Sequence, residues 1–282
     1  MIEVGPNRYG KSSIRLVKVD RDRAPHRVRD LTIAISLEGD FATSYSAGDN
    51  STVIATDTMK NTAYALAGEH LTGAIERFGL ALARHFLAEP QVARTTVSID
   101  EHAWRPIGDA PDAFTRDPSM TRTAVVRADR DAAEIRAGIR DLAVMKTSRS
   151  AFAGFPRDRF TTLAETDDRI LATAVTTSWR YGEADLDFDA SFESVRSTFL
   201  AVFADHDSAS VQASIWIVGS AVLERHREVE EISMSLPNLH HWTVDLERFG
   251  IENDHEVYVS TTEPHGLIEA TIRRGEAGRP RS

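Results

Sequence analysis

The sequence predicts an α+β fold made of two tandem repeats, each with an antiparallel sheet and with helices on one face of that sheet. Segments in which apolar and polar residues alternate with period two flank segments with a period near 3.6. The order strand, strand, helix, strand, strand occurs twice along the 282 residues. Apolar residues make up 41% of the chain and charged residues 27%, which is typical of a globular protein.

The first repeat is expected to span residues 1–136. Its predicted elements are strands at 13–20, 28–38, 93–105 and 122–128 and a helix over 57–87. The polar turn with Pro25 joins the first two strands into a hairpin, and the helix is expected to break near Gly68. Asp57 or Thr58 is available to cap the first helical turn. Residues 108–119 are rich in Gly, Pro and Asp and are expected to form a loop.

The second repeat is expected to span residues 137–282, after a charged helical turn or linker at 129–137. Its predicted elements are strands at 142–148, 169–179, 232–246 and 256–273 and a helical region over 192–226 that breaks at 205–210. Pro237 interrupts the third of these strands. Because proline donates no hydrogen bond to a sheet, we expect a kink or bulge that redirects Asn238 and His240.

Sheets of this kind leave unpaired edges, and no long run of charged residues protects them. We therefore expect an oligomer in which sheets from different subunits continue one another into a barrel. The alternative is a monomer whose loops cover the edges.

The composition excludes several classes of function. Without cysteine, the chain has no disulfide, no thiolate nucleophile and no cysteine-based metal site. A net charge of −10 disfavours nucleic-acid binding, and no segment reaches the length of a membrane span. The N-terminus has no apolar core and the C-terminus lacks a Ser-Lys-Leu ending, so a cytoplasmic location is expected. No phosphate-loop or metal motif occurs, and the adjacent His240 and His241 point to opposite faces of a strand, so no metal site is expected.

Four places contain residues that could act on a ligand. Lys11 lies before the first strand, although a lone lysine is usually a surface charge. Thr56 and Asp57 begin a helix, where free N–H groups can bind an anion, but where such residues are also ordinary caps. Phe152 could stack on a planar ring or belong to the core, and the fork of Arg169 suits two parallel acceptors. The last place is the amide of Gln212, at the start of a helical segment, which could bind the edge of a heterocycle.

Several separated motifs, in order, resemble the urate oxidase family over almost the whole chain. They are Asn7-Arg-Tyr-Gly-Lys11, Ala55-Thr-Asp57 with Lys60-Asn-Thr62, Phe152 with Arg157-Asp158 and Thr161-Thr-Leu163, Asp168-Arg-Ile-Leu171, Ser208-Ala-Ser-Val-Gln212, Ser235-Leu-Pro-Asn238 with His240, and Pro264-His-Gly-Leu-Ile268. The resemblance implies two tandem tunnelling-fold (T-fold) domains in each subunit and a homotetramer with active sites at subunit interfaces. It also implies oxidation of urate by dioxygen and water to 5-hydroxyisourate and hydrogen peroxide, with no metal or flavin cofactor. One departure is Leu239, where relatives often have a cation.

The same resemblance implies a role for each candidate residue. Lys11, Thr56 and His240 match the groups that handle protons, and Thr56 and Asp57 reach the substrate from a neighbouring subunit. An amine acts as a base only when it is deprotonated, which desolvation or nearby positive charge favours. The remaining matches concern substrate binding: Arg169 and Gln212 hold the purine, Phe152 stacks on it, Val211 offers a main-chain contact, and Asn238 lies beside the dioxygen or water position.

Two alternatives stay open at the level of the sequence. One is a T-fold enzyme that acts on a pterin-like heterocycle, for which a carboxylate anchor is common. The other is a non-catalytic purine-binding assembly protein with this fold.

Overall fold

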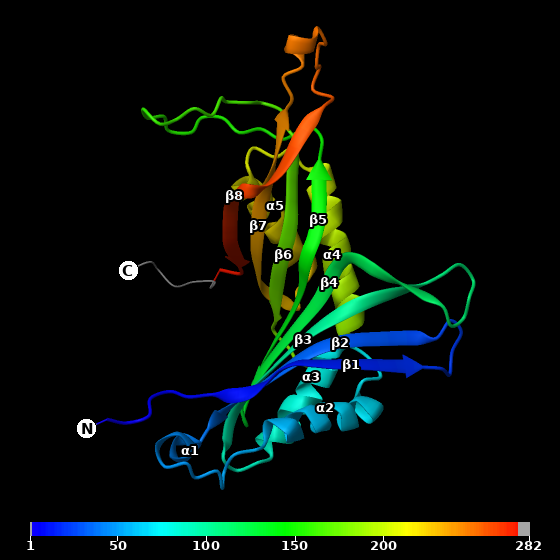
Figure 1. The fold of residues 1–282 in the computed structure, drawn as a ribbon, viewed down its shortest axis with the longest axis vertical. Helices are drawn as coiled ribbons and strands as arrows, with labels where there is room; N and C mark the ends of the chain where they lie inside the picture. Colours follow the sequence, from blue (N-terminus) through cyan, green and yellow to red (C-terminus); the bar gives the residue numbers. More distant parts are fainter. Residues whose placement is uncertain (1, 276–282) are drawn as a thin grey trace. The chain divides into compact units, whose positions relative to one another are not determined.

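The computed structural model describes residues 2–275, so the C-terminal residues considered above for a Ser-Lys-Leu ending lie outside the described residues. Eight strands form one sheet in the order β1-β2-β3-β4-β5-β6-β7-β8 (Figure 1). The strands are β1 (Tyr9–Asp20), β2 (Arg27–Gly39), β3 (Val92–Pro106), β4 (Phe114–Ala128), β5 (Ala133–Lys146), β6 (Leu171–Tyr181), β7 (Val229–Thr243) and β8 (Tyr258–Arg273). The helices are α1 (Ala42–Ser46), α2 (Thr56–His70), α3 (Ile75–Leu87), α4 (Phe188–Asp205) and α5 (Val211–Arg225), with a 3-10 turn at Glu247–Phe249.

The α+β prediction is confirmed, and the order of elements repeats. Two strands, a helical region and two strands are followed by the same succession, with α2 and α3 in the first half and α4 and α5 in the second. Within residues 2–275, no helix is long and apolar enough to cross a membrane. Contacts divide the chain into two compact units, which we call unit 1 (Met1–Ile139 with Ser178–Phe192) and unit 2 (Arg140–Thr177 with Glu193–Ser282).

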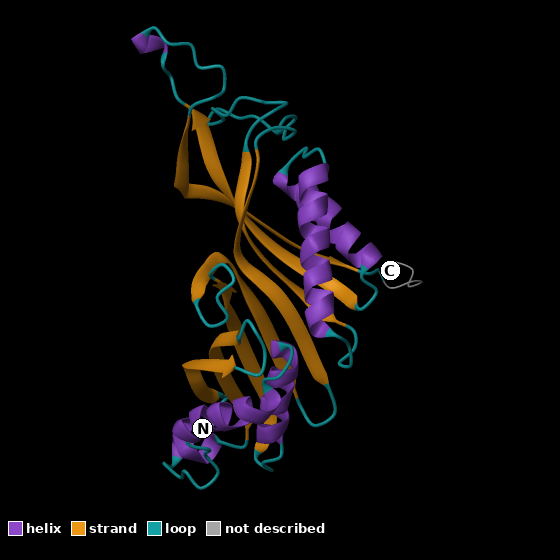
Figure 2. Cartoon of the chain, turned by 90° about the vertical axis from the view of Figure 1, so that its right-hand side faces the viewer, coloured by secondary structure: helices purple, strands orange, loops and turns teal. Residues whose placement is uncertain are grey.

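In unit 1, α2 and α3 pack against antiparallel strands (Figure 2). Alternate residues of the strands, such as Ile33, Ile99 and Val126, are fully buried, as period-two alternation predicts. Helix α3 lies close to the strands at Gly79, where an added Cβ would lie 2.8 Å from Val126 Cγ2. A glycine at this position therefore sets the distance between helix and sheet.

In unit 2, a helical glycine likewise lies in close contact with the strands. Helix α5 packs on β7 and β8, and a Cβ added to Gly219 would lie 2.6 Å from Ile272 and 2.9 Å from Met234. The strands that Gly219 contacts, β7 and β8, occupy the places in the second half that β3 and β4 occupy in the first.

A lysine closes the C-terminal end of one helix in each unit. In unit 1, Lys18 Nζ donates to the carbonyls of Ala67, Gly68 and Leu71 at 2.9–3.1 Å. In unit 2, the buried Lys146 Nζ donates in the same way to the carbonyls of Phe203, Ala204 and His206 at 2.5–3.3 Å. A cation at this position satisfies carbonyls that have no partner within the helix and compensates the negative end of the helix dipole.

Three local predictions were wrong. Strand β4 begins at Phe114, so the expected loop at 108–119 is strand over its second half. Residues 133–137, expected as part of a helical turn or linker, begin β5. Neither Asp57 nor Thr58 caps α2, because the cap position is Ala55 and no side chain bonds to the first turn. The expected break in this helical region is confirmed a few residues after Gly68, because α2 ends at His70 and α3 begins at Ile75.

Candidate active site

A pocket of about 660 Å³ lies within unit 2 and contains four of the predicted site residues. Phe152 and Arg169 line it from the chain between β5 and β6, and Asn238 and His240 line it from β7. These residues are far apart in the sequence, so the fold of unit 2 alone brings them together.

Phe152 and Arg169 form one wall of this pocket. The Arg169 guanidinium carbon lies 5.1 Å from the centroid of the Phe152 ring, and Phe155 stacks on the same ring at 5.0 Å with an interplanar angle of 15°. Two main-chain hydrogen bonds between Phe152 and Thr166, at 2.8 and 3.1 Å, fix this segment against the chain that leads to Arg169. The pair thus offers a flat apolar surface beside a fork of N–H donors.

The guanidinium of Arg169 is not satisfied by the protein. Its Nε is buried and has no hydrogen-bond partner. Desolvation lowers the pKa of the Arg169 guanidinium, although an arginine stays protonated at neutral pH. A buried donor without an acceptor costs free energy, so an unpaired cation in a pocket indicates a place for an anionic or carbonyl-rich ligand.

Residues of strand β7 line the other side of the pocket. The expected kink is a bulge: Asn238 pairs with Gly266 and His240 with Thr261, so Leu239 alone lies opposite residues 262–265 of β8. Pro237 stays within the strand opposite Leu267, and the irregularity follows it directly. Bulges of this kind redirect side chains next to binding sites.

His240 is held by its neighbours. Its ring stacks on Trp242 with centroids 5.3 Å apart and planes at 23°. Desolvation, followed by the positive charges of Arg169 and His265, lowers the pKa of His240. The imidazole is therefore neutral at neutral pH, the form in which it can accept a proton at one nitrogen and donate one at the other.

Val211 and Gln212 are the first two residues of α5 and do not line this pocket. Ser210 caps the helix by accepting the N–H of Ala213, and Val211 is buried while Gln212 is exposed. The first N–H groups of a helix have no acceptor within it, so the Val211 N–H is available to a ligand. The preceding turn pairs with the start of the Phe152 segment through a bridge between Ser150 and Ser208.

The remaining candidates belong to unit 1. Lys11 lines a pocket of about 420 Å³ over β1, β2 and β3 and directly precedes a bulge in β1. Lys11 pairs with Ile35 and Ile14 with Ile33, so Ser12 and Ser13 lie opposite Ala34 alone. Ser13 has a left-handed φ of 57°. The amine is thus placed at an irregular point of an otherwise regular strand.

Thr56 and Asp57 begin α2 and are tied to the same strand as Lys11. The hydroxyl of Tyr9 accepts the N–H of Ile54 at 2.8 Å, which fixes the approach to the helix against β1. The hydrogen bond from Lys60 and its charge lower the pKa of Asp57, with a further contribution from Lys11. Because α2 has no side-chain cap, its first N–H groups are open to an acceptor from outside.

Two residues near His240 had no role assigned from the sequence: Trp242, whose ring contacts it, and His265, which was matched only as part of a family motif and lowers its pKa. Period two along the strand could have indicated Trp242, since residues two apart share a face. His265 lies in the bulged part of β8, and no sequence pattern places it near His240. Within residues 2–275, no three His, Asp or Glu side chains lie together as metal ligands would.

Comparison with known proteins gives one consistent family. A sequence model of the family Uricase matches residues 7–127 and 135–269. The uricase of Arthrobacter globiformis is 46% identical over 274 residues, which is 97% of this chain and 90% of the relative. That of Dictyostelium discoideum is 37% identical over 279 residues, 96% of this chain and 97% of the relative. The crystal structure of the Arthrobacter globiformis uricase superposes with a TM-score of 0.95 at 45% identity and covers 100% of this chain and 98% of that one. A uricase structure from Bacillus fastidious gives 0.83 at 25% identity over 95% of this chain and 93% of that one.

Proposed function

The chain belongs to the uricase family. We propose that it oxidises urate with dioxygen and water to 5-hydroxyisourate and hydrogen peroxide, and that Arg169, Phe152 and His240 form the core of the active site. The observation that supports this site best is the unpaired Arg169 Nε beside the Phe152 ring, in a pocket that also contains His240. Urate is a flat, anionic heterocycle with carbonyl acceptors on its edges. It would supply the acceptors that the guanidinium lacks and the ring face that Phe152 can stack on.

In this proposal, each residue near the pocket has one task. Arg169 donates two parallel N–H groups to one edge of the purine, and Gln212 and the Val211 N–H bind another edge. Phe152 holds the plane of the ring, and Asn238 lies beside the dioxygen or water above it. Such an arrangement discriminates against analogues that lack the matching acceptors, since buried donors would then stay unpaired.

Proton handling is assigned to Lys11, Thr56 and His240, with Asp57 beside them. Removal of a further proton makes urate a better electron donor. Dioxygen then takes two electrons and two protons and leaves as hydrogen peroxide, while C5 of the purine gains a hydroxyl group from water. We propose that Lys11 acts as base through the Thr56 hydroxyl and that the neutral His240 passes the proton on. No metal or flavin takes part in this scheme, because the substrate itself supplies the electrons.

We further propose two tandem T-fold domains, 1–136 and 137–282, and a homotetramer in which Thr56 and Asp57 reach the substrate site of a neighbouring subunit. Two observations support assembly: the edge strands β1 and β8 have no further partner strand among the described residues, and apolar side chains such as Val17, Trp216 and Leu267 are exposed. A cytoplasmic location is proposed as well, which a cysteine-free chain suits.

The decisive experiment uses the whole protein after treatment with a chelator. Urate is added, and ultraviolet absorbance, oxygen uptake and peroxide are followed together. Turnover with one peroxide formed for each oxygen consumed supports the scheme, and activity that returns only when a metal is added contradicts it. Lys11→Met should lower kcat by about 100-fold or more with a smaller change in KM, whereas an unchanged kcat removes Lys11 from the role of base.

A further inference from the structure

We propose that Arg149 is a positioning residue for this reaction, one that aligns the Phe152 segment with the start of α5. The inference rests on the proposed function, because it concerns how the purine-binding groups Phe152, Val211 and Gln212 are held in register. Arg149 itself lies outside the pocket wall. It would therefore act through other residues, without touching the substrate.

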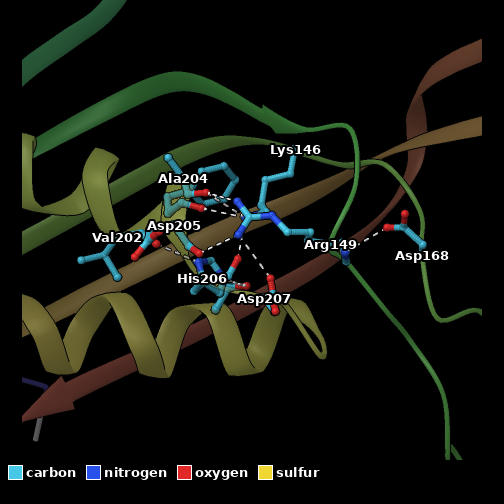
Figure 3. A network of polar contacts seen from close by, with 11 residues as sticks. Lys146, Arg149, Asp168, Val202, Ala204, Asp205, His206 and Asp207 are labelled. Carbon is cyan, nitrogen blue, oxygen red and sulfur yellow. Dashed lines mark hydrogen bonds and ion pairs between the residues drawn. The ribbon is translucent and has the colours of Figure 1, made fainter.

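The guanidinium of Arg149 holds the chain between α4 and α5. Its Nη2 donates to the Ala204 carbonyl at 2.6 Å and its Nη1 to the Asp205 carbonyl at 2.8 Å. Nη1 also lies 3.3 Å from the Asp207 carboxylate. Figure 3 shows the side chain reaching across to these three groups, with Lys146 beside it. Two neighbouring cations thus bind the last carbonyls of α4 and fix where the following turn begins.

The main chain of the same residue ties this turn to the Phe152 segment. The Arg149 carbonyl accepts the N–H of Ser208 at 2.9 Å, and the N–H of Ala151 donates to the Ser208 carbonyl at 2.7 Å. Ser208 is three residues before Val211, and Ala151 directly precedes Phe152. Arg149 therefore bonds, through its side chain and its carbonyl, to the segment that leads into α5, and it belongs itself to the segment that leads to Phe152.

A third segment joins at the same point. The N–H of Ser150 donates to the Asp168 carboxylate at 3.3 Å, and Asp168 directly precedes Arg169. The residue after Arg149 thus connects also to the segment that carries Arg169, which lies on the same wall of the pocket as Phe152.

The conformation of Arg149 fits a residue whose position is imposed by its surroundings. Its φ of 59° lies in the left-handed region, where a side chain with a Cβ is unfavourable and where Asn and Gly are better tolerated. Such a conformation persists only when the contacts around it determine it. The ion pair with the exposed Asp207 contributes little to this, because both partners are half or more exposed to solvent. The two carbonyl contacts are the ones that matter.

The test uses full-length variants, steady-state kinetics with urate, and binding of xanthine, a purine that lacks the C8 oxygen. Arg149→Met removes the guanidinium, and Arg149→Asn removes it while it suits the left-handed backbone, so at least one variant should fold. Arg149→Lys keeps a donor for one carbonyl. Arg130→Met is the matched control, because Arg130 also donates to two carbonyls just after a helix, those of Glu89 and Pro90 at 3.2 and 3.0 Å, in unit 1.

We expect Arg149→Met and Arg149→Asn to raise KM and the xanthine dissociation constant about tenfold. The value of kcat should change by less than about twofold, because the substitution weakens the binding of substrate and of transition state equally. Arg149→Lys should restore part of the affinity, and Arg130→Met should change none of these values. Equal KM values in wild type and both Arg149 variants would overturn the inference, and so would a loss in Arg130→Met of the same size. The proposed site is tested separately with Arg169→Lys. If that variant binds xanthine normally, the site assignment fails. If it loses xanthine affinity while the Arg149 variants keep theirs, only the positioning role of Arg149 is refuted.

Discussion

Arg169 offers a prediction in which stability and function change in opposite directions. In the free protein its Nε is buried without an acceptor, and its guanidinium has lost part of its hydration. The substitution Arg169→Met keeps most of the apolar stem and removes the charge. We expect this variant to bind purines poorly and to be at least as stable as the wild type.

The magnitudes follow from the contacts. Loss of the interaction with the Phe152 ring, at 5.1 Å, costs about 0.5–1 kcal/mol, and removal of an unpaired buried donor returns about 1–3 kcal/mol. The free energy of unfolding should thus rise by about 1 kcal/mol, which is about 2–4 °C in Tm for a domain of this size. In the complex, two charge-assisted hydrogen bonds of about 1.5 kcal/mol or more each are lost, so affinity for xanthine should fall by on the order of 100-fold.

The assay combines thermal unfolding without ligand and xanthine titration on the same preparations. Arg159→Met is the control, because the Arg159 guanidinium also lies over a phenylalanine, Phe160 at 4.5 Å, but on an exposed loop segment. The control should leave xanthine affinity unchanged. A marked drop in Tm for Arg169→Met, or affinity equal to that of the control, would refute the reasoning that this cation is kept for a ligand at the expense of stability.

The remaining predictions concern the charge of one histidine and the contact of one helix. His265→Asn should raise the pKa of His240 and move the acid limb of the kcat/KM profile to higher pH, since the positive charge of His265 helps to lower that pKa; an unshifted limb would contradict this. The folded-state pKa of His240 lies below the unfolded value of about 6.5, so the stability that this histidine contributes is present above that pH and is lost as the pH falls through the folded-state pKa. In chemical denaturation, the free energy of unfolding of His240→Gln should therefore fall less on acidification than that of the wild type. Gly79→Ala should destabilise unit 1 by about 1–3 kcal/mol, because the new Cβ would lie 2.8 Å from Val126. Gly68→Ala, which has open space around its Cβ, should stabilise α2 by up to about 1 kcal/mol. A denaturant midpoint that is higher for Gly79→Ala than for Gly68→Ala would be evidence against the close contact.

The sequence predicted the strands best where one face is buried and the other polar. It failed at β5 because charged residues dominate its start. Ile135, Ala137 and Ile139 are buried at every second position, but the charged Glu134 and Arg136 next to Ile135 suggested a solvated linker. The true turn is shorter: the Asp129 carboxylate accepts the N–H groups of residues 131 and 132 and reverses the chain there.

Strand β4 was shortened for a related reason. Its first half carries no apolar alternation, and it is held instead by cross-strand contacts with β3. Arg116 lies opposite Trp104 with its guanidinium carbon 5.8 Å from the ring centroid, and Arg105 pairs with Asp117 at 2.5 Å. Contacts between strands that are distant in sequence cannot be inferred from the periodicity of either strand alone.

The candidate site shows the same limit. Residue chemistry alone left Phe152 as either core or ring platform, and Lys11 as an ordinary surface charge. Only the order of several motifs, through the family resemblance, connected them with His240. The geometry of unit 2 now supplies the physical reason for three of the choices, since Phe152, Arg169 and His240 share one pocket.

The paired features of the two halves bear on how this enzyme arose. Lys18 and Lys146 close corresponding helices, and Gly79 and Gly219 admit corresponding strands, whereas the proposed base belongs to the first half and the proposed purine clamp to the second. We infer that an ancestral half-length chain already possessed the lysine closure and the glycine contact before its gene was copied. After the copying, each descendant half was free to specialise, one by supplying the base and the other by binding the ring, while the inherited framework stayed the same.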